Sequence, residues 1–190
     1  MENYKKPGFG YKYFDVVKKV LAVFFGLFAL VVIVSLFLSS EYSVGRDIKI
    51  DCKDSTVKHF VYNPSEWTKW SVWSSKTDST IVFTYSGPEE GENAIMHFES
   101  ELMGTGSLKI VDINQNTIVY KMAFSEDSFV IDGLIEIIPQ NNATKVNWVI
   151  TGDVGWNPFA KYLKSVIADL IAEDIEVNLK NLKKICENAQ

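Results

Sequence analysis

One run of 19 uncharged and almost wholly apolar residues, 20–38, constrains this chain more than any other feature. As a helix it would be roughly 28 Å long, close to the ~30 Å of a bilayer's hydrocarbon core. It exceeds the apolar core of a secretory signal peptide, and residues 38–40 lack the small-x-small pattern that signal peptidases cleave. It also has no polar face to meet water. The run predicts a retained transmembrane helix, with a cleaved signal peptide as the alternative.

The charges on either side of this run predict its orientation. Five lysines precede it, whereas acidic and basic residues are mixed in the segment that follows. Because lysine-rich flanks stay in the cytoplasm, we expect the N-terminus there and the remainder on the periplasmic or extracellular side. The chain then divides into a basic cytoplasmic tail (1–19), a membrane span (20–38) and one domain (42–190).

The expected domain is acidic and contains both cysteines. From residue 42 onward there are 14 Lys and Arg against 21 Asp and Glu. Without a basic stripe, such a surface is not expected to bind nucleic acid or anionic lipid. Cys52 and Cys186 are too few for a disulfide scaffold. Two buried thiols are the expected state, and a bridge is the alternative for an exported domain.

Within the domain, apolar and polar residues alternate in short runs separated by Gly, Pro, Asn and Asp. This pattern predicts strands with one buried face. Seven are expected, at residues 44–52, 81–85, 94–99, 104–110, 118–124, 131–137 and 145–151. Two short helices should follow the first strand, one capped by Asp54 and one started by Asn63-Pro64. Asn157-Pro158 should start a long C-terminal helix, in which apolar residues recur at three- and four-residue steps.

Together these elements predict an α+β layer, a curved antiparallel sheet wrapped on the long C-terminal helix and preceded by one transmembrane helix. A twisted sheet and a straight helix do not meet everywhere, so a cavity is expected between them. The side chains expected to line it are Phe83, Tyr85, Met96, Phe98, Leu108, Tyr120, Met122, Ile135 and Trp148.

Four segments, in this order, carry a resemblance to a known family: 44–50, 67–73, 84–88 and 144–153. The second reads Trp-Thr-Lys-Trp-Ser-Val-Trp, with Val72 where the family usually has proline. The order resembles the helix-grip fold of the START/Bet v 1 superfamily, specifically the polyketide cyclase/dehydrase-like SRPBCC proteins. The resemblance covers about residues 42–188 and implies a hydrophobic-ligand pocket, without implying a particular reaction.

The three tryptophans of that segment, Trp67, Trp70 and Trp73, stand at three-residue steps and would share one side of a helical turn. They suit either a pocket mouth that grips an apolar ligand or a plug at the end of the core. The plug is favoured, because aromatic clusters are commonly core.

Titratable groups that could support catalysis are scarce. His59 and His97 have no partner at metal-ligand spacing, so neither a metal nor another cofactor is predicted. Arg46 is expected to be solvated, and the inward rows retain only Tyr85 and Tyr120 as weak acids. We expect a membrane-anchored protein that binds an apolar small molecule or lipid without catalysis. The alternatives are a cyclase- or dehydratase-like enzyme that uses one of these tyrosines, and a protein-interaction domain with a filled core.

Overall fold

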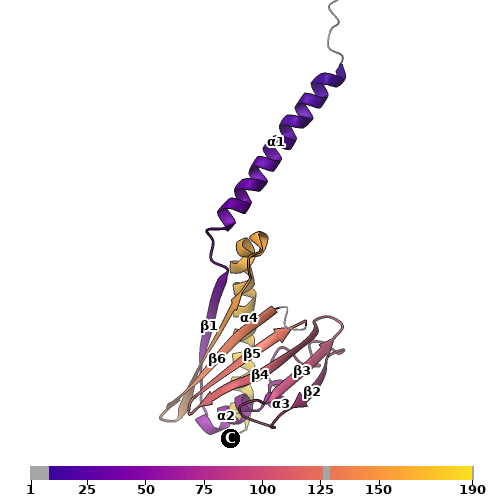
Figure 1. Ribbon diagram of the computed structural model, residues 1–190. Helices are drawn as coiled ribbons and strands as arrows, with labels where there is room; N and C mark the ends of the chain where they lie inside the picture. Colours follow the sequence, from indigo (N-terminus) through magenta and orange to yellow (C-terminus); the bar gives the residue numbers. More distant parts are fainter. Residues whose placement is uncertain (1–8, 126–128, 190) are drawn as a thin grey trace, which may run out of the picture.

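The computed structural model describes residues 9–125 and 129–189. In this part of the chain one seven-stranded sheet wraps around a long C-terminal helix, and a separate helix projects from one end (Figure 1). The predicted α+β fold class is confirmed. In chain order the elements are α1 (Phe9–Ser35), β1 (Glu41–Ile50), α2 (Asp54–Tyr62), α3 (Pro64–Trp67), β2 (Val82–Ser86), β3 (Ile95–Ser100), β4 (Gly104–Asn114), β5 (Thr117–Phe124), β6 (Phe129–Gln140), β7 (Ala143–Asp153) and α4 (Pro158–Asn188).

Helix α1 contains a stretch, Tyr13–Ser35, that is long and apolar enough to cross a membrane, with a mean hydropathy of 2.5 over its most apolar window. The helix starts before the predicted span, because nothing in residues 9–19 breaks a helix. It also ends three residues earlier than predicted, at Ser35, whose hydroxyl donates a hydrogen bond to the Val32 carbonyl at 2.6 Å. Residues 1–8 of the predicted tail lie outside the described residues.

The strand order is β1-β7-β6-β5-β4-β3-β2, and every neighbouring pair is antiparallel. On the concave face, three aromatic rings each lie over the glycine directly opposite on the next strand. These pairs are Phe98 over Gly106, Tyr120 over Gly133 and Tyr42 over Gly152. Because a glycine leaves room for the ring and lets the strand bend, these pairs let the sheet curl around α4.

Both Asn-Pro sequences start helices as predicted. The Asn63 side chain accepts a hydrogen bond from the Ser65 N–H at 2.9 Å, and Asn157 accepts bonds from Phe159 N–H and Ala160 N–H. The prediction for Asp54 was wrong. It is the first residue of α2 rather than its cap, and its carboxylate pairs with Lys58 at 2.8 Å, one turn along the helix.

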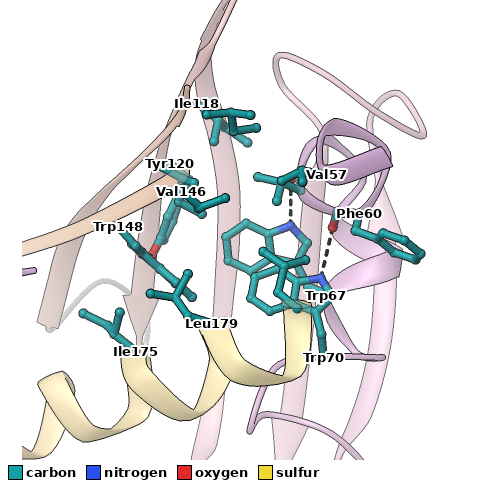
Figure 2. Packing of buried hydrophobic residues seen from close by; sticks show 14 of the residues in the cluster. Val57, Phe60, Trp67, Trp70, Ile118, Tyr120, Val146, Trp148, Ile175 and Leu179 are labelled. Carbon is teal, nitrogen blue, oxygen red and sulfur yellow. Dashed lines mark hydrogen bonds between the residues drawn. The ribbon is translucent and has the colours of Figure 1, made fainter. Parts of the chain in front are cut away.

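The tryptophan segment does not continue as one helix, because α3 ends at Trp67. Trp67 and Trp70 are buried side by side beneath α2 (Figure 2). Their indole N–H groups donate to the Val61 and Phe60 carbonyls at 2.8 and 3.0 Å. These carbonyls belong to the last turn of α2, which has no partners for them within the helix. Both side chains are therefore part of the core, as the plug interpretation predicts, and Trp67 also lines the cavity described below.

Helix α4 covers the sheet with only its C-terminal half. Its buried residues are Ala172, Ile175, Asn178, Leu179, Leu182 and Cys186. The first turns project beyond the sheet toward α1 (Figure 1), and leave Phe159, Leu163, Val166 and Leu170 exposed. Only the C-terminal part of the predicted apolar stripe therefore faces the sheet. A helix of 31 residues is about 46 Å long, and the strands cross it obliquely.

Candidate functional site

A cavity of about 70 Å³ lies between the concave face of the sheet and the middle of α4. It is lined by Trp67, Ser71, Trp73, Met96, Tyr120, Met122, Ile131, Trp148, Ile150, Ile171, Asp174, Ile175 and Asn178. An apolar cavity of about 150 Å³ can bind benzene, and pockets for drug-sized ligands occupy about 300–1,000 Å³. Side chains therefore fill most of the space between sheet and helix. The cavity is smaller than the family resemblance implied.

The inner wall is an aromatic cluster with one polar pair. The Trp148 indole N–H donates a hydrogen bond to the Tyr120 hydroxyl at 2.8 Å, and the Trp67 ring packs edge-on against Tyr120, with 5.0 Å between ring centroids. Burial raises the pKa of Tyr120 well above its usual range. The hydroxyl is therefore a hydrogen-bonding group and not an acid at neutral pH. A tyrosine that accepts one hydrogen bond keeps its own hydrogen to donate.

The opposite wall is polar and joins α4 to the tryptophan segment. The buried Asn178 side chain accepts a hydrogen bond from the Val72 N–H at 2.6 Å. One helical turn further on, the Asn181 side chain donates to the Trp70 carbonyl at 3.0 Å. Asp174 stands at the rim, where partial desolvation and the nearby Glu173 carboxylate raise its pKa. These two amide bonds hold the segment against α4 beside the cavity.

Four of the nine residues predicted to line a cavity do line it: Met96, Tyr120, Met122 and Trp148. Phe98, Leu108 and Ile135 are buried in the core but do not line the cavity. Phe83 and Tyr85 lie on the concave face of β2, an edge strand, so Phe83 is half-buried and Tyr85 is 49% exposed. The role of all nine as ligand contacts stays a prediction.

The other candidate residues lie at the surface. Burial raises the pKa of Tyr85, and a hydrogen bond with the Thr68 side chain opposes the rise. His97 is exposed and lies 3.0 Å from the Ser86 hydroxyl through its Nε2 atom. Arg46 is exposed, on the concave face of β1. Among residues 9–125 and 129–189, no group of three or more His, Cys, Asp or Glu side chains is placed to hold a metal ion.

Sequence reasoning missed the residues that α4 contributes to the cavity. An apolar stripe of seven turns does not say which turn faces a gap, so Ile171 and Ile175 could not be distinguished from their neighbours. One signal was present. Asn178 interrupts the stripe between Ile175 and Leu179, and a polar side chain at a buried helix position needs a specific partner.

Comparisons with solved structures support the fold. A protein from Thermobifida fusca superposes with a TM-score of 0.58 at 18% identity, over 77% of this chain and 93% of that one. The protein TTHA0849 from Thermus thermophilus gives 0.57 at 17% identity, over 78% and 99%. Ara h 8.0201 gives 0.55 at 12% identity, over 78% and 99%. Identities this low show the fold alone, a Bet v 1-like helix-grip fold.

No protein-family model matches the chain, and no curated protein matches it. The narrower resemblance to polyketide cyclase/dehydrase-like proteins therefore stays a prediction. The side of the membrane on which the domain lies also stays a prediction, because the length and apolar character of α1 do not indicate in which direction the helix would cross.

Proposed function

We propose that this chain is a membrane-anchored binding protein that holds a small apolar molecule, or the apolar part of a lipid, between its sheet and α4. The observation that carries the proposal is the cavity, because most of the residues that line it are aromatic or otherwise apolar. Burial of apolar surface would supply the affinity, at roughly 25 cal/mol per Å². The Tyr120 hydroxyl offers one hydrogen bond, which suits a ligand with a single oxygen.

A ligand larger than the cavity requires the wall to move. The tryptophan segment and α4 are joined there by the Asn178–Val72 and Asn181–Trp70 hydrogen bonds. Each such bond contributes about 0.5–1.5 kcal/mol net, so separating the two walls costs little compared with the burial of an apolar ligand. We propose that the cavity expands on this side.

The test uses the fact that Trp67, Trp73 and Trp148 line the cavity. The full chain carrying Trp156→Phe, which removes an exposed indole, is placed in nanodiscs and titrated with bromonaphthalene or dibrominated stearate. Bromine quenches tryptophan only in close contact. Saturable quenching is expected for one of the two probes, and the responding probe distinguishes a ring system from an acyl chain.

Two variants on α4 give the matched control. Ile175→Phe fills the cavity, whereas Leu170→Phe adds a ring at an exposed position of the same helix. The Ile175 variant should bind the probe at least about tenfold more weakly, which corresponds to ~1.4 kcal/mol, and the Leu170 variant should bind as before. Quenching that does not saturate, or equal quenching in both variants, would reject the proposal.

The small volume of the cavity supports a second candidate, a protein-interaction domain with a filled core. An enzyme has less support. Its predicted acid, Tyr120, has a raised pKa, and Tyr85 lies at the edge of the sheet, away from the cavity. If both probes fail to bind and the Ile175→Phe variant is more stable than the parent, the filled-core function is favoured.

We also propose that the N-terminus is cytoplasmic and the domain lies on the periplasmic or extracellular side. The lysines before the span support this orientation. Protease added to intact cells or spheroplasts should then degrade the domain. Protection of the domain until the membrane is permeabilised would show the opposite orientation.

A further inference from the structure

The first turns of α4 present a continuous apolar surface that the sheet does not cover. Phe159, Leu163, Val166 and Leu170 are all more than half exposed. They follow one another at steps of four, three and four residues, and therefore share one face of the helix. Trp156, in the turn before the helix, is 87% exposed. We call these five residues the α4 tip surface.

Three contacts hold the start of α4 against the end of α1. The Tyr162 hydroxyl donates a hydrogen bond to the Val31 carbonyl at 2.8 Å, and the Lys161 ammonium donates to the Ser35 carbonyl at 3.2 Å. The Phe159 ring packs against the Phe28 ring, with 6.3 Å between centroids. The start of α4 thus lies beside the last two turns of the candidate span, Tyr13–Ser35.

This position determines what can cover the α4 tip surface. If α1 spans a bilayer, Phe28 lies seven residues inside its end, about 10 Å along the helix axis. The residues that pack against it then lie at the level of the headgroups and upper acyl chains, where a water-soluble partner does not reach. Tryptophan and tyrosine favour this level, and lysines extend from it toward water and phosphate.

We propose that the α4 tip surface docks on the lipid bilayer, in the leaflet from which the domain emerges. This rests on the proposed membrane anchoring. Lys161 and Lys164 both donate hydrogen bonds to backbone carbonyls at the end of α1 and the segment after it. Helical spacing places both lysines on the side of α4 away from the exposed stripe, so the stripe itself carries no charge. Insertion is therefore driven by aromatic and aliphatic burial and does not require anionic lipid.

The test places the full chain in phosphatidylcholine nanodiscs that contain nitroxide-labelled lipid. The emission of Trp156 is taken as the difference between the parent and Trp156→Phe. We expect nitroxide near the headgroup to quench this emission by about twofold, and nitroxide near the chain end to quench it less. The matched control is Asn141→Trp in the Trp156→Phe background, at the β6–β7 turn. Figure 1 shows this end of β6 far from α1.

Flotation of the full chain with liposomes after a carbonate wash separates the two failures. A chain that does not float has no anchor, and the proposed anchoring fails along with the docking. A chain that floats but whose Trp156 emission resists quenching, or is quenched no more than the Asn141→Trp control, is anchored without docking, and this inference alone is overturned.

An independent observation concerns the two cysteines. Cys52 follows β1 and Cys186 lies in the last turns of α4, and both are buried. The two thiols are close enough that each affects the pKa of the other. The neighbouring residues are also tied together, since the Asp51 N–H donates to the Glu187 carboxylate at 2.9 Å and the Lys183 ammonium donates to the Lys49 carbonyl at 2.8 Å. The two ends of the domain thus meet at this pair.

We infer that Cys52 and Cys186 form an intramolecular disulfide when the domain meets a disulfide-bonded thiol oxidant. One thiolate attacks the oxidant's disulfide, and the second thiolate then displaces the reduced oxidant from the mixed disulfide. The protein loses two thiol protons and two electrons, and the oxidant leaves as a dithiol. Burial raises the pKa of both thiols, so the exchange is slow until this end of the domain opens.

The full chain is equilibrated in a glutathione redox buffer with enough urea to open the domain transiently, then quenched with acid and alkylated. The expected product takes up no alkylating agent and is two hydrogen atoms lighter by mass spectrometry. Each single variant, Cys52→Ser and Cys186→Ser, should be alkylated once. Two alkylated thiols, or glutathione on either cysteine in the parent, would overturn the inference.

Discussion

Gly133→Ala should be strongly destabilising although it adds a single methyl group. The Tyr120 ring occupies the space above Gly133, and an alanine Cβ would overlap its Cζ, Cε1 and Oη atoms. Nonbonded carbon atoms favour separations of about 3.5–4.0 Å. The ring must therefore move, and it is almost completely buried.

The loss in free energy of unfolding can be estimated from the interactions that change when the Tyr120 ring moves. Moving its hydroxyl breaks the 2.8 Å hydrogen bond from the buried Trp148 indole, and an unsatisfied buried donor costs about 1–3 kcal/mol. Forcing the ring into the neighbouring Trp67 adds about 1–3 kcal/mol of overpacking. The total of about 2–6 kcal/mol is a large part of the ~5–15 kcal/mol that stabilises a typical domain.

The measurement is urea unfolding of the detergent-solubilised full chain, followed by tryptophan fluorescence. The control is the same substitution in a Tyr120→Leu background, where the ring is absent and the added methyl should cost much less. A loss below about 0.5 kcal/mol in the parent, or equal losses in the two backgrounds, would refute the steric argument.

The remaining predictions concern two hydrogen-bonded side chains and the cysteine pair. Asn178→Leu removes the acceptor of the Val72 N–H and should cost about 1–3 kcal/mol in the same urea titration; an unchanged midpoint would contradict this. Hydrogen bonds from Ser100 and, to a smaller extent, Thr80 lower the pKa of Asp78 in the folded protein. The ionised carboxylate therefore adds to the free energy of unfolding at pH values above its unfolded-state pKa of ~3.9, and this stabilisation is lost as the pH falls through the lower folded-state pKa. Asp78→Asn should therefore flatten the acid limb of a stability–pH curve, and an unaltered limb would exclude this source. If the disulfide forms, reduction by dithiothreitol should lower the free energy of unfolding by about 4–5 kcal/mol, as for loops of ~100 residues or more, and should not affect the double serine variant.

Much of the fold could be predicted from local patterns. Alternation placed all seven strands and their concave faces, because side chains on a strand must point to opposite sides. Asn63-Pro64 and Asn157-Pro158 located two helix starts, since the amide caps and the proline ring fits the first turn. The prediction of Asp54 as the cap failed, because Asp54 is already inside the helix, where its carboxylate pairs with Lys58 one turn along.

The cavity could not be predicted in the same way, because its size depends on cross-strand packing. Alternation identified Leu108 and Ile135 as inward residues, but did not show that core side chains fill the space around them. It also did not reveal that Gly133 admits the Tyr120 ring, which brings that residue within reach of Trp148. Register between strands distant in sequence sets these contacts, and no single strand encodes it.

The two roles proposed for α4 can be separated, because they use different faces of one helix. Leu170 and Ile171 are consecutive residues and point about 100° apart around the helix axis, Leu170 into the exposed surface and Ile171 into the cavity wall. A helix that served only the sheet would gain nothing from the apolar residues before this point, whereas a bilayer surface would cover them. Ile175→Phe should therefore weaken probe binding without changing the quenching of Trp156 by labelled lipid, and Leu163→Ser should do the reverse. If each variant alters both measurements equally, the helix acts as a single unit, and the division of α4 at Leu170 is wrong.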